Sequence, residues 1–226
     1  MEWNQLLSLV ASNPAVAVRI DSRQVQPGDV FVAIRGASCD GHQFIGQAIA
    51  KGARYIVCEN GTPTDGQVTF VPVENPAVAA GLLAQASNGN PGNRLTCLAV
   101  TGTNGKTTVT YLVKACIESS GRKCGLIGTV VYDTGSGTTQ SSLTTPDCLT
   151  LAEAQREMVA GDTTHMVMEA SSHALSQDRL AGVNFRAAAF TNLTGDHMDY
   201  HKTVENYLAA KTRLFTALAP DAVAVL

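Results

Sequence analysis

The sequence predicts an α/β protein in two parts: a small N-terminal α/β domain and a larger, mostly parallel, doubly wound sheet. Apolar runs of strand length alternate with stretches that place apolar residues at helical spacing. A glycine-rich turn directly follows one of these runs, at residues 102–105. Residues 87–93 read SNGNPGN, which is typical of a linker. We therefore expect domains at residues 1–90 and 91–226.

In the first part, the predicted strands cover residues 16–20, 29–34, 54–58 and 68–73. Between the second and third strands, residues 42–51 carry apolar side chains at helical spacing. A second helix is predicted over residues 76–86, because Pro76 is tolerated in the first turn of a helix.

In the second part, strands are predicted over residues 95–101, 124–129, 165–169, 185–191 and 222–226. Helices are predicted over residues 106–120, 149–160 and 204–218. This alternation favours a doubly wound parallel sheet. Because the chain stops inside an apolar run, we expect it to be truncated.

Composition offers no support for several classes of partner. The chain has 226 residues, is 45% hydrophobic and 15% charged, and carries a net charge of −3. That balance gives no reason to expect nucleic acid or an anionic membrane as a partner. No apolar run reaches the roughly 18–20 residues of a membrane span, so membrane insertion is not expected. The N-terminus lacks the basic region of a signal peptide, and the six cysteines form no CxxC pair, which favours a cytoplasmic chain with reduced thiols.

The most informative motif is TGTNGKTT, residues 101–108, which lies between a predicted strand and a predicted helix. Gly102 and Gly105 would let the backbone approach a polyphosphate, and the N–H groups at the helix start would face it. Lys106 would neutralise phosphate charge, and the Thr107 hydroxyl would bind Mg²⁺. Val100 occupies the first glycine position of the full Walker pattern, so a chance glycine-rich turn is the alternative. The motif predicts a sheet of the P-loop ATPase type.

Polar side chains also follow the later strands, where parallel α/β sheets bind ligands. Glu169 ends one strand and precedes ASSHAL, and the next strand runs into NLTGDHMDYH, residues 192–201. Lys211 lies on the last predicted helix. Singly, each has a simpler interpretation: Glu169 as a solvated carboxylate, Lys211 as a surface lysine, and His197 with His201 as an incomplete zinc pair.

Taken together and in order, these segments resemble the Mur ligase family. The resemblance rests on TGTNGKTT, LTTPD (residues 143–147), EASSHAL (169–175), TNLTGDHMDYH (191–201) and YLAAKTRLF (207–215). The segments DSR (21–23) and PGDVFVA (27–33) resemble the family's uridine-binding domain. LTTPD and EASSHAL favour the branch that adds the third residue of the peptidoglycan stem peptide over the D-Ala-D-Ala-adding branch and folylpolyglutamate synthetases.

The resemblance implies roles for individual residues. ATP would be bound by residues of the loop and one asparagine: Gly102, Thr103, Asn104, Gly105, Lys106, Thr107, Thr108 and Asn192. The UDP-linked substrate would be bound by Ser22, Thr144, Thr145, Ser171, Gln177 and Arg179, with residues 36–41 as a uridine loop. Magnesium would be held by Thr107, Glu169 and His197. The catalytic residues would be Lys106 and a carbamylated Lys211.

The resemblance also implies a reaction. ATP, with Mg²⁺, would activate a carboxylate of UDP-MurNAc-L-Ala-D-Glu as an acyl phosphate, which the amine of diaminopimelate or lysine would attack. A third domain of the family carries the amino-acid site, so we expect this chain to bind ligands without completing ligation, and to be a monomer. Two alternatives stay open from the residues alone: a small-molecule phosphotransferase, and a nucleotide-binding module that does not hydrolyse its ligand.

Overall fold

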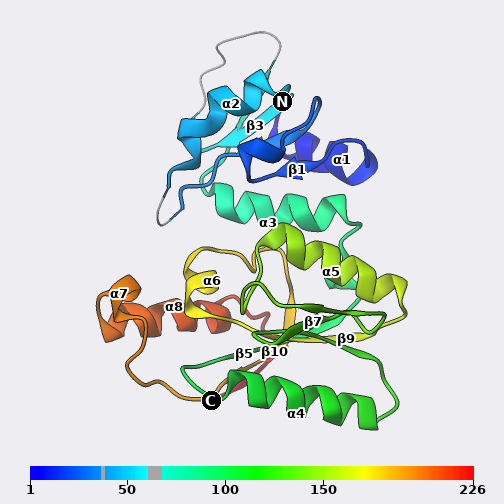
Figure 1. The fold of residues 1–226 in the computed structure, drawn as a ribbon, viewed down its shortest axis with the longest axis vertical. Helices are drawn as coiled ribbons and strands as arrows, with labels where there is room; N and C mark the ends of the chain where they lie inside the picture. The colour runs from blue at the N-terminus through cyan, green and yellow to red at the C-terminus, as the bar shows by residue number, and fades with distance from the viewer. Residues whose placement is uncertain (37–38, 61–67) are drawn as a thin grey trace. The chain divides into compact units, whose positions relative to one another are not determined.

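The computed structural model describes residues 1–36, 39–60 and 68–226 (Figure 1). The chain forms two compact units, Met1–Asn90 and Pro91–Leu226. Each unit contains its own sheet, and the two sheets differ in size and in strand direction.

The first unit has a four-stranded, all-parallel sheet in the order β1-β2-β3-β4. Its strands are β1 (Val18–Arg19), β2 (Val30–Val32), β3 (Tyr55–Cys58) and β4 (Thr69–Pro72), each inside a predicted run but shorter. Every residue of β2 is buried, which is why its apolar run is continuous instead of alternating.

The helices of this unit are α1 (Trp3–Ser12), η1 (Ser22–Gln24), η2 (Gly41–Phe44), α2 (Ile45–Ala50) and α3 (Pro76–Ser87). The Asn75 side chain caps α3 by accepting from the backbone N–H groups of Ala77 and Val78. The helix predicted over residues 42–51 divides into a 3₁₀ turn and a short α-helix. Helix α1 was not predicted, although Glu2 and Gln5 form a capping box at its start.

The second unit has a seven-stranded sheet in the order β11-β10-β5-β9-β6-β7-β8. Its strands are β5 (Thr96–Thr101), β6 (Cys124–Ile127), β7 (Val131–Asp133), β8 (Thr138–Gln140), β9 (His165–Glu169), β10 (Phe185–Phe190) and β11 (Val223–Val225). The strands from β11 to β6 are parallel, as predicted, whereas β7 and β8 add an antiparallel hairpin. The hairpin escaped prediction because β8 is short, polar and exposed.

The helices of the second unit are η3 (Pro91–Asn93), α4 (Lys106–Ser119), α5 (Cys148–Ala160), α6 (Ser172–Ser176), α7 (Met198–His201) and α8 (Val204–Thr216). Asp147 and Thr203 cap α5 and α8 with side-chain oxygens. The predicted linker is only partly irregular, because Ser87 ends α3 and Pro91 begins η3. Among the described residues, no helix has both the length and the apolar character required to cross a membrane.

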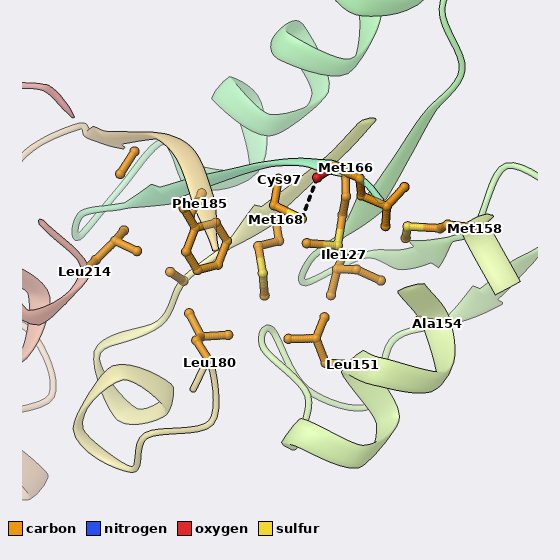
Figure 2. Close-up of a cluster of buried hydrophobic side chains, with 14 of the residues drawn as sticks. Cys97, Ile127, Leu151, Ala154, Met158, Met166, Met168, Leu180, Phe185 and Leu214 are labelled. Atoms are coloured by element: carbon orange, nitrogen blue, oxygen red, sulfur yellow. Dashed lines mark hydrogen bonds between the residues drawn. The ribbon is translucent and has the colours of Figure 1, made fainter. Parts of the chain in front are cut away.

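Two apolar layers sandwich the second sheet. On one face, Met166 and Met168 of β9 pack in a cluster with Leu151 of α5 and Leu214 of α8 (Figure 2). On the other face, Val167 belongs to a cluster packed by residues of α4. Successive β9 residues thus point to opposite faces, and both faces are covered. This arrangement confirms the predicted doubly wound α/β class.

Candidate nucleotide and substrate site

The polar segments identified in the sequence meet at the carboxyl ends of three neighbouring strands. Strand β5 lies between β10 and β9. The chain leaves β5 toward β6 on one side of the sheet, and it leaves β9 toward β10 on the other side. The two connections diverge at β5 and β9, and doubly wound sheets open a crevice at such a point. The phosphate loop follows β5, Glu169 ends β9, and Thr191 follows β10.

The phosphate loop requires glycine at its first turn. Gly102 has φ +140°, and a Cβ there would lie 1.9 Å from Thr191 Oγ1. Gly105 has φ +83° and caps the N-terminus of α4 in the left-handed region. The chain thus reaches the start of a 14-residue helix through a turn that L side chains resist. Thr108 lies exposed in the first turn of that helix.

The segment after β10 holds the loop in place. Asn192 pairs with Asn104 in both directions: its Oδ1 accepts from the Asn104 N–H at 3.0 Å, and its Nδ2 donates to the Asn104 carbonyl at 3.0 Å. The Asn192 carbonyl accepts from the N–H of Thr103 at 2.9 Å. Asn192 was expected near the nucleotide, and in the structure its contacts are with the loop.

Two lysines converge on one carbonyl oxygen. Lys106 Nζ donates to the carbonyls of Gly102 at 2.9 Å and Thr103 at 2.8 Å, and Lys211 Nζ donates to that of Gly102 at 2.8 Å. Lys211 is only 1% exposed and lies 4.4 Å from the Tyr207 ring centroid. The interpretation of Lys211 as a surface lysine is therefore excluded.

The same packing changes the acidity of both ammonium groups. Burial and, next, the positive charge of Lys106 lower the pKa of Lys211 to about 8, against a smaller opposing effect of Asp196. Burial also lowers the pKa of Lys106, although Glu169 and Asp196 act in the opposite direction. The ammonium groups of both lysines are thus partly removed from water, and their hydrogen bonds go to uncharged backbone carbonyls.

Glu169 is held by a second set of donors. Its Oε1 accepts from Thr107 Oγ1 at 3.0 Å and from the Thr129 N–H at 2.8 Å, and its Oε2 accepts from Thr129 Oγ1 at 3.1 Å. Glu169 is 1% exposed, so it is not a solvated surface carboxylate. Thr129 was not identified from the sequence, where it only ended a predicted strand. The oxygens of Thr107 and Glu169 are hard donors of the kind that Mg²⁺ prefers.

The expected substrate residues of the second unit form one hydrogen-bonded network. Thr145 Oγ1 donates to the Glu169 carbonyl at 2.8 Å and accepts from the Ser171 N–H at 3.0 Å. Arg179 donates to the Thr145 carbonyl at 3.0 Å and, with two further nitrogens, to Gln177 Oε1 at 3.0 and 2.6 Å. Thr144 joins the network through the Thr129 hydroxyl, at 3.1 Å.

Ser22 belongs to the other unit. It is buried, and its hydroxyl donates to Gln47 Oε1 at 2.8 Å. Of the expected uridine loop, residues 37 and 38 lie outside the described residues. The neighbouring backbone closes through a hydrogen bond from the Gly36 N–H to the Cys39 carbonyl at 2.9 Å.

His197 lies in a group of aromatic rings. It adopts φ +53° before α7, its Nε2 lies 3.5 Å from Asp196, and its ring meets that of His173 edge-on at 4.7 Å. No hydrogen bond or ion pair joins His197 to Glu169 among the residues with defined positions. His201 Nε2 lies 2.9 Å from Ser172 Oγ, and burial lowers the pKa of both His173 and His201. Within the described ranges, no group of three or more His, Cys, Asp or Glu side chains could hold a metal ion, so the zinc interpretation lacks support.

Comparison with known proteins decides the family. A family profile described as "Mur ligase middle domain" matches residues 100–226, and one described as "Mur ligase family, catalytic domain" matches residues 15–88. The chain belongs to the Mur ligase family. The resemblance seen in the sequence motifs is thereby confirmed.

Two curated relatives bear the name UDP-N-acetylmuramoyl-L-alanyl-D-glutamate–2,6-diaminopimelate ligase. The protein from Clostridium tetani is 42% identical over 201 residues, covering 88% of this chain and 41% of the relative. That from Phocaeicola vulgatus is 42% identical over 216 residues, covering 95% of this chain and 45% of the relative. The chain therefore spans less than half the length of these Mur ligases.

Solved structures show the same fold. A structure bearing the same diaminopimelate ligase name is 30% identical, has a TM-score of 0.71, and is matched over 89% of this chain and 41% of its own. The MurF ligase from Thermotoga maritima, solved in complex with ADP, is 23% identical with a TM-score of 0.55. That match covers 93% of this chain and 45% of the MurF chain, and it shows the fold alone.

Proposed function

We propose that residues 1–226 bind ATP and the UDP-linked substrate of a ligase that adds 2,6-diaminopimelate to UDP-MurNAc-L-Ala-D-Glu in peptidoglycan synthesis. Membership of the Mur ligase family and the name shared by the relatives support this choice of substrate and amino acid. The observation that carries the nucleotide-binding role is the convergence of Lys106 and Lys211 on the Gly102 carbonyl.

The two lysines make this loop a strong candidate for polyphosphate. Two ammonium groups sharing one neutral oxygen repel each other, and this repulsion adds to burial, the larger cause, in lowering the pKa of Lys211. A phosphate group within reach of Lys106 would replace a carbonyl acceptor by an anion and relieve the repulsion. The backbone N–H groups at the start of α4 and the helix dipole would favour the same anion.

Magnesium fits the oxygen pair of Thr107 and Glu169, which lie 3.0 Å apart at the end of the loop. His197 is our candidate for a further ligand on the side of α7. When bound, Mg²⁺ would offset the negative charge of the phosphates. Thr129, through its N–H and hydroxyl, would keep the carboxylate of Glu169 oriented toward the loop.

We propose that Lys211 carries a carbamate in the active protein. An amine with a pKa near 8 is partly neutral at physiological pH, and a neutral amine can bond to CO₂ and release a proton. The product is an anion in place of a cation, which removes the repulsion from Lys106. Incubation with ¹³C-bicarbonate should give a carbamate signal that is absent from the Lys211→Arg variant. A spectrum without that signal at neutral and mildly alkaline pH would contradict the assignment.

The reaction follows from these roles. A carboxylate oxygen of the D-Glu residue bonds to the γ-phosphorus of ATP as the bond to the bridging oxygen breaks, giving an acyl phosphate and ADP. The amine of diaminopimelate then bonds to the acyl carbon, inorganic phosphate leaves, and the amine loses a proton. Lys106 would lower the repulsion between the two anions of the first step, and Arg179 would hold the substrate beside the loop.

The six cysteines are all free, which is consistent with a cytoplasmic protein. We propose that location, and we expect a monomer that neither binds nucleic acid nor inserts into a membrane.

Calorimetric titration with Mg-ATP and, separately, with UDP-MurNAc-L-Ala-D-Glu tests the proposed function. We expect both ligands to bind this chain. A phosphotransferase or a simple nucleotide-binding module would bind Mg-ATP without recognising the UDP-linked dipeptide. Binding of the nucleotide alone would therefore refute the ligase assignment, and binding of neither would refute the site.

A further inference from the structure

The corner between β6 and β7 joins two parts of the candidate site. Its residues are Gly128 and Thr129, which directly follow β6. The Thr129 N–H and hydroxyl reach the two carboxylate oxygens of Glu169 at 2.8 and 3.1 Å. The same hydroxyl lies 3.1 Å from Thr144 Oγ1. One exposed threonine therefore contacts both the carboxylate that faces the loop and a residue of the substrate network.

Gly128 allows this close approach. A Cβ at Gly128 would lie 2.4 Å from Glu169 Oε1, a distance that would push the carboxylate away. The backbone of Gly128 therefore packs directly against the Glu169 carboxylate, where a side chain would not fit. A turn that merely reversed the chain would not require that contact.

The chemistry of the three groups sets the direction of their hydrogen bonds. A carboxylate only accepts, and Thr129 Oγ1 is the donor to both Glu169 Oε2 and Thr144 Oγ1, at 3.1 Å each, so these two oxygens share its single hydrogen. The hydroxyl hydrogen of Thr144 is therefore not used by Thr129. That hydrogen can be donated to an acceptor oxygen of a ligand, such as a peptide carbonyl or a carboxylate.

We infer that Thr129 is a positioning residue that couples the nucleotide side of the site to the substrate side. This inference rests on the proposed function of the chain. A metal–nucleotide complex held by Glu169 would compete for its carboxylate oxygens, so the shared Thr129 hydrogen would pass to Thr144 and fix the orientation of its hydroxyl. Binding at the loop thereby prepares Thr144 for the substrate, and by thermodynamic reciprocity the substrate strengthens binding at the loop.

The position of these hydrogen bonds indicates which part of the substrate responds. Glu169 contacts Thr107 of the phosphate loop at 3.0 Å, so Thr144 lies on the side where the reacting carboxylate and the γ-phosphate must meet. Thr129 should consequently influence the dipeptide end of the substrate. The affinity for UDP, which lacks that end, should not depend on Thr129.

Three variants test the coupling by calorimetry. Thr129→Val removes the hydroxyl and keeps the backbone N–H, Thr129→Ser restores the hydroxyl, and Thr139→Val makes the same change at an exposed threonine of the β7–β8 hairpin. For each, the affinity for UDP-MurNAc-L-Ala-D-Glu is measured with and without Mg-ADP. Affinities for Mg-ADP and for UDP are measured separately.

We expect Thr129→Val to bind Mg-ADP about 10-fold more weakly, because removing an outer-shell partner of a metal-facing carboxylate has effects of that size. The effect of Mg-ADP on substrate affinity, present in the wild type, should disappear. Thr129→Ser and Thr139→Val should behave as the wild type, and UDP should bind all four proteins equally. Because Thr129→Val removes a donor from the buried carboxylate of Glu169, its thermal midpoint should fall, whereas Thr129→Ser and Thr139→Val should keep that of the wild type.

The outcomes separate this inference from the proposed function. If the wild type binds neither Mg-ADP nor the UDP-linked dipeptide, the proposed function is wrong. If the wild type binds both and Thr129→Val keeps the effect of Mg-ADP on substrate affinity, the coupling role is wrong while the function stands. Equal losses in Thr129→Val and Thr129→Ser would also overturn the inference, because the hydroxyl would then not be the cause.

Discussion

The phosphate loop and the Glu169 corner lie side by side at the end of the sheet, but their polar groups are satisfied in different ways. At the loop, the ammonium groups of Lys106 and Lys211 are held by neutral carbonyls and share that of Gly102. At the corner, the carboxylate of Glu169 receives an N–H and two hydroxyl groups. Among the described residues, the two ammonium groups of the loop have no anionic hydrogen-bond partner, whereas the carboxylate at the corner accepts three hydrogen bonds.

This difference suggests how each side contributes to binding. The loop should gain most from an anionic ligand, because such a ligand replaces weak acceptors by strong ones. The corner is already organised and should mainly position groups, at little cost when the ligand arrives. Variants on the two sides should therefore differ in what they change: ligand affinity on one side, and geometry or coupling on the other.

The largest effect should come from the backbone of the loop itself. In Gly102→Ala, the new Cβ would meet Thr191 Oγ1 at 1.9 Å and the Asn192 backbone at 3.1 Å, in a φ that L side chains rarely adopt. We expect the free energy of unfolding to fall by about 3 kcal/mol or more, as steric overlap and backbone strain add. Urea denaturation measures it. Gly137→Ala, where a Cβ meets nothing within 4 Å, should change stability by less than about 1 kcal/mol. Equal effects in the two variants would show that the loop is not constrained at Gly102.

Lys106→Ala should be next in size and should act on affinity. Loss of a charge-assisted contact to polyphosphate should weaken Mg-ATP binding about 100-fold, which corresponds to roughly 3 kcal/mol. Calorimetry with Mg-ATP measures the change. Lys123→Ala is a matched control, because Lys123 also donates to a backbone carbonyl, that of Gly161, but lies outside the site. Unchanged affinity in Lys106→Ala would remove the loop as the nucleotide site.

Arg179 tests the substrate side. Its guanidinium donates to both the Thr145 carbonyl and Gln177 Oε1. Arg179→Lys keeps the positive charge but cannot make these hydrogen bonds from one planar group. We expect affinity for UDP-MurNAc-L-Ala-D-Glu to fall about 10-fold, or roughly 1.4 kcal/mol, while Mg-ATP binds as before. Calorimetry with each ligand makes the comparison, and the exposed Arg156→Lys provides the control. A loss of nucleotide affinity in Arg179→Lys would mean that the two sides of the site are not separable.

Sequence reasoning was reliable where one local rule decides the structure. The buried strands β5 and β9 have continuous apolar runs, and the loop after β5 has glycines where positive φ is required. Both features depend only on residues that are neighbours in the sequence, so the doubly wound class could be predicted. Strand ends were less accurate, because they depend on pairing with neighbouring strands.

Features set by distant residues could not be predicted in the same way. Thr129 meets Glu169 forty positions away along the chain, and nothing local marks it as a partner of a carboxylate. The burial of Lys211 depends on packing of α8 near the loop, so composition alone suggested a surface lysine. Asn192 was placed near the nucleotide by resemblance, but its contacts with Asn104 became visible only in the folded chain.

The smallest expected effect concerns the pH dependence of stability at the loop. Lys211 has a folded-state pKa of about 8, below the value of roughly 10.4 for an unfolded lysine. Below pH 8 the lysine is protonated in both states, so the cost of its buried charge is constant. Between these two pKa values the unfolded state binds more protons than the folded state, so stability rises with pH.

Comparison of the wild type with Lys211→Met isolates this contribution. The free energy of unfolding of the wild type, relative to the variant, should rise by about 1 kcal/mol between pH 8 and pH 9. Tyr207, whose pKa burial raises, and the buried cysteines are present in both proteins, so their titrations largely cancel in the difference. Urea denaturation across this range measures it, with CO₂ excluded so that a carbamate cannot form. A flat difference would mean that Lys211 keeps an ordinary pKa, and the contrast between a strained cationic loop and a satisfied corner would then lose its electrostatic basis.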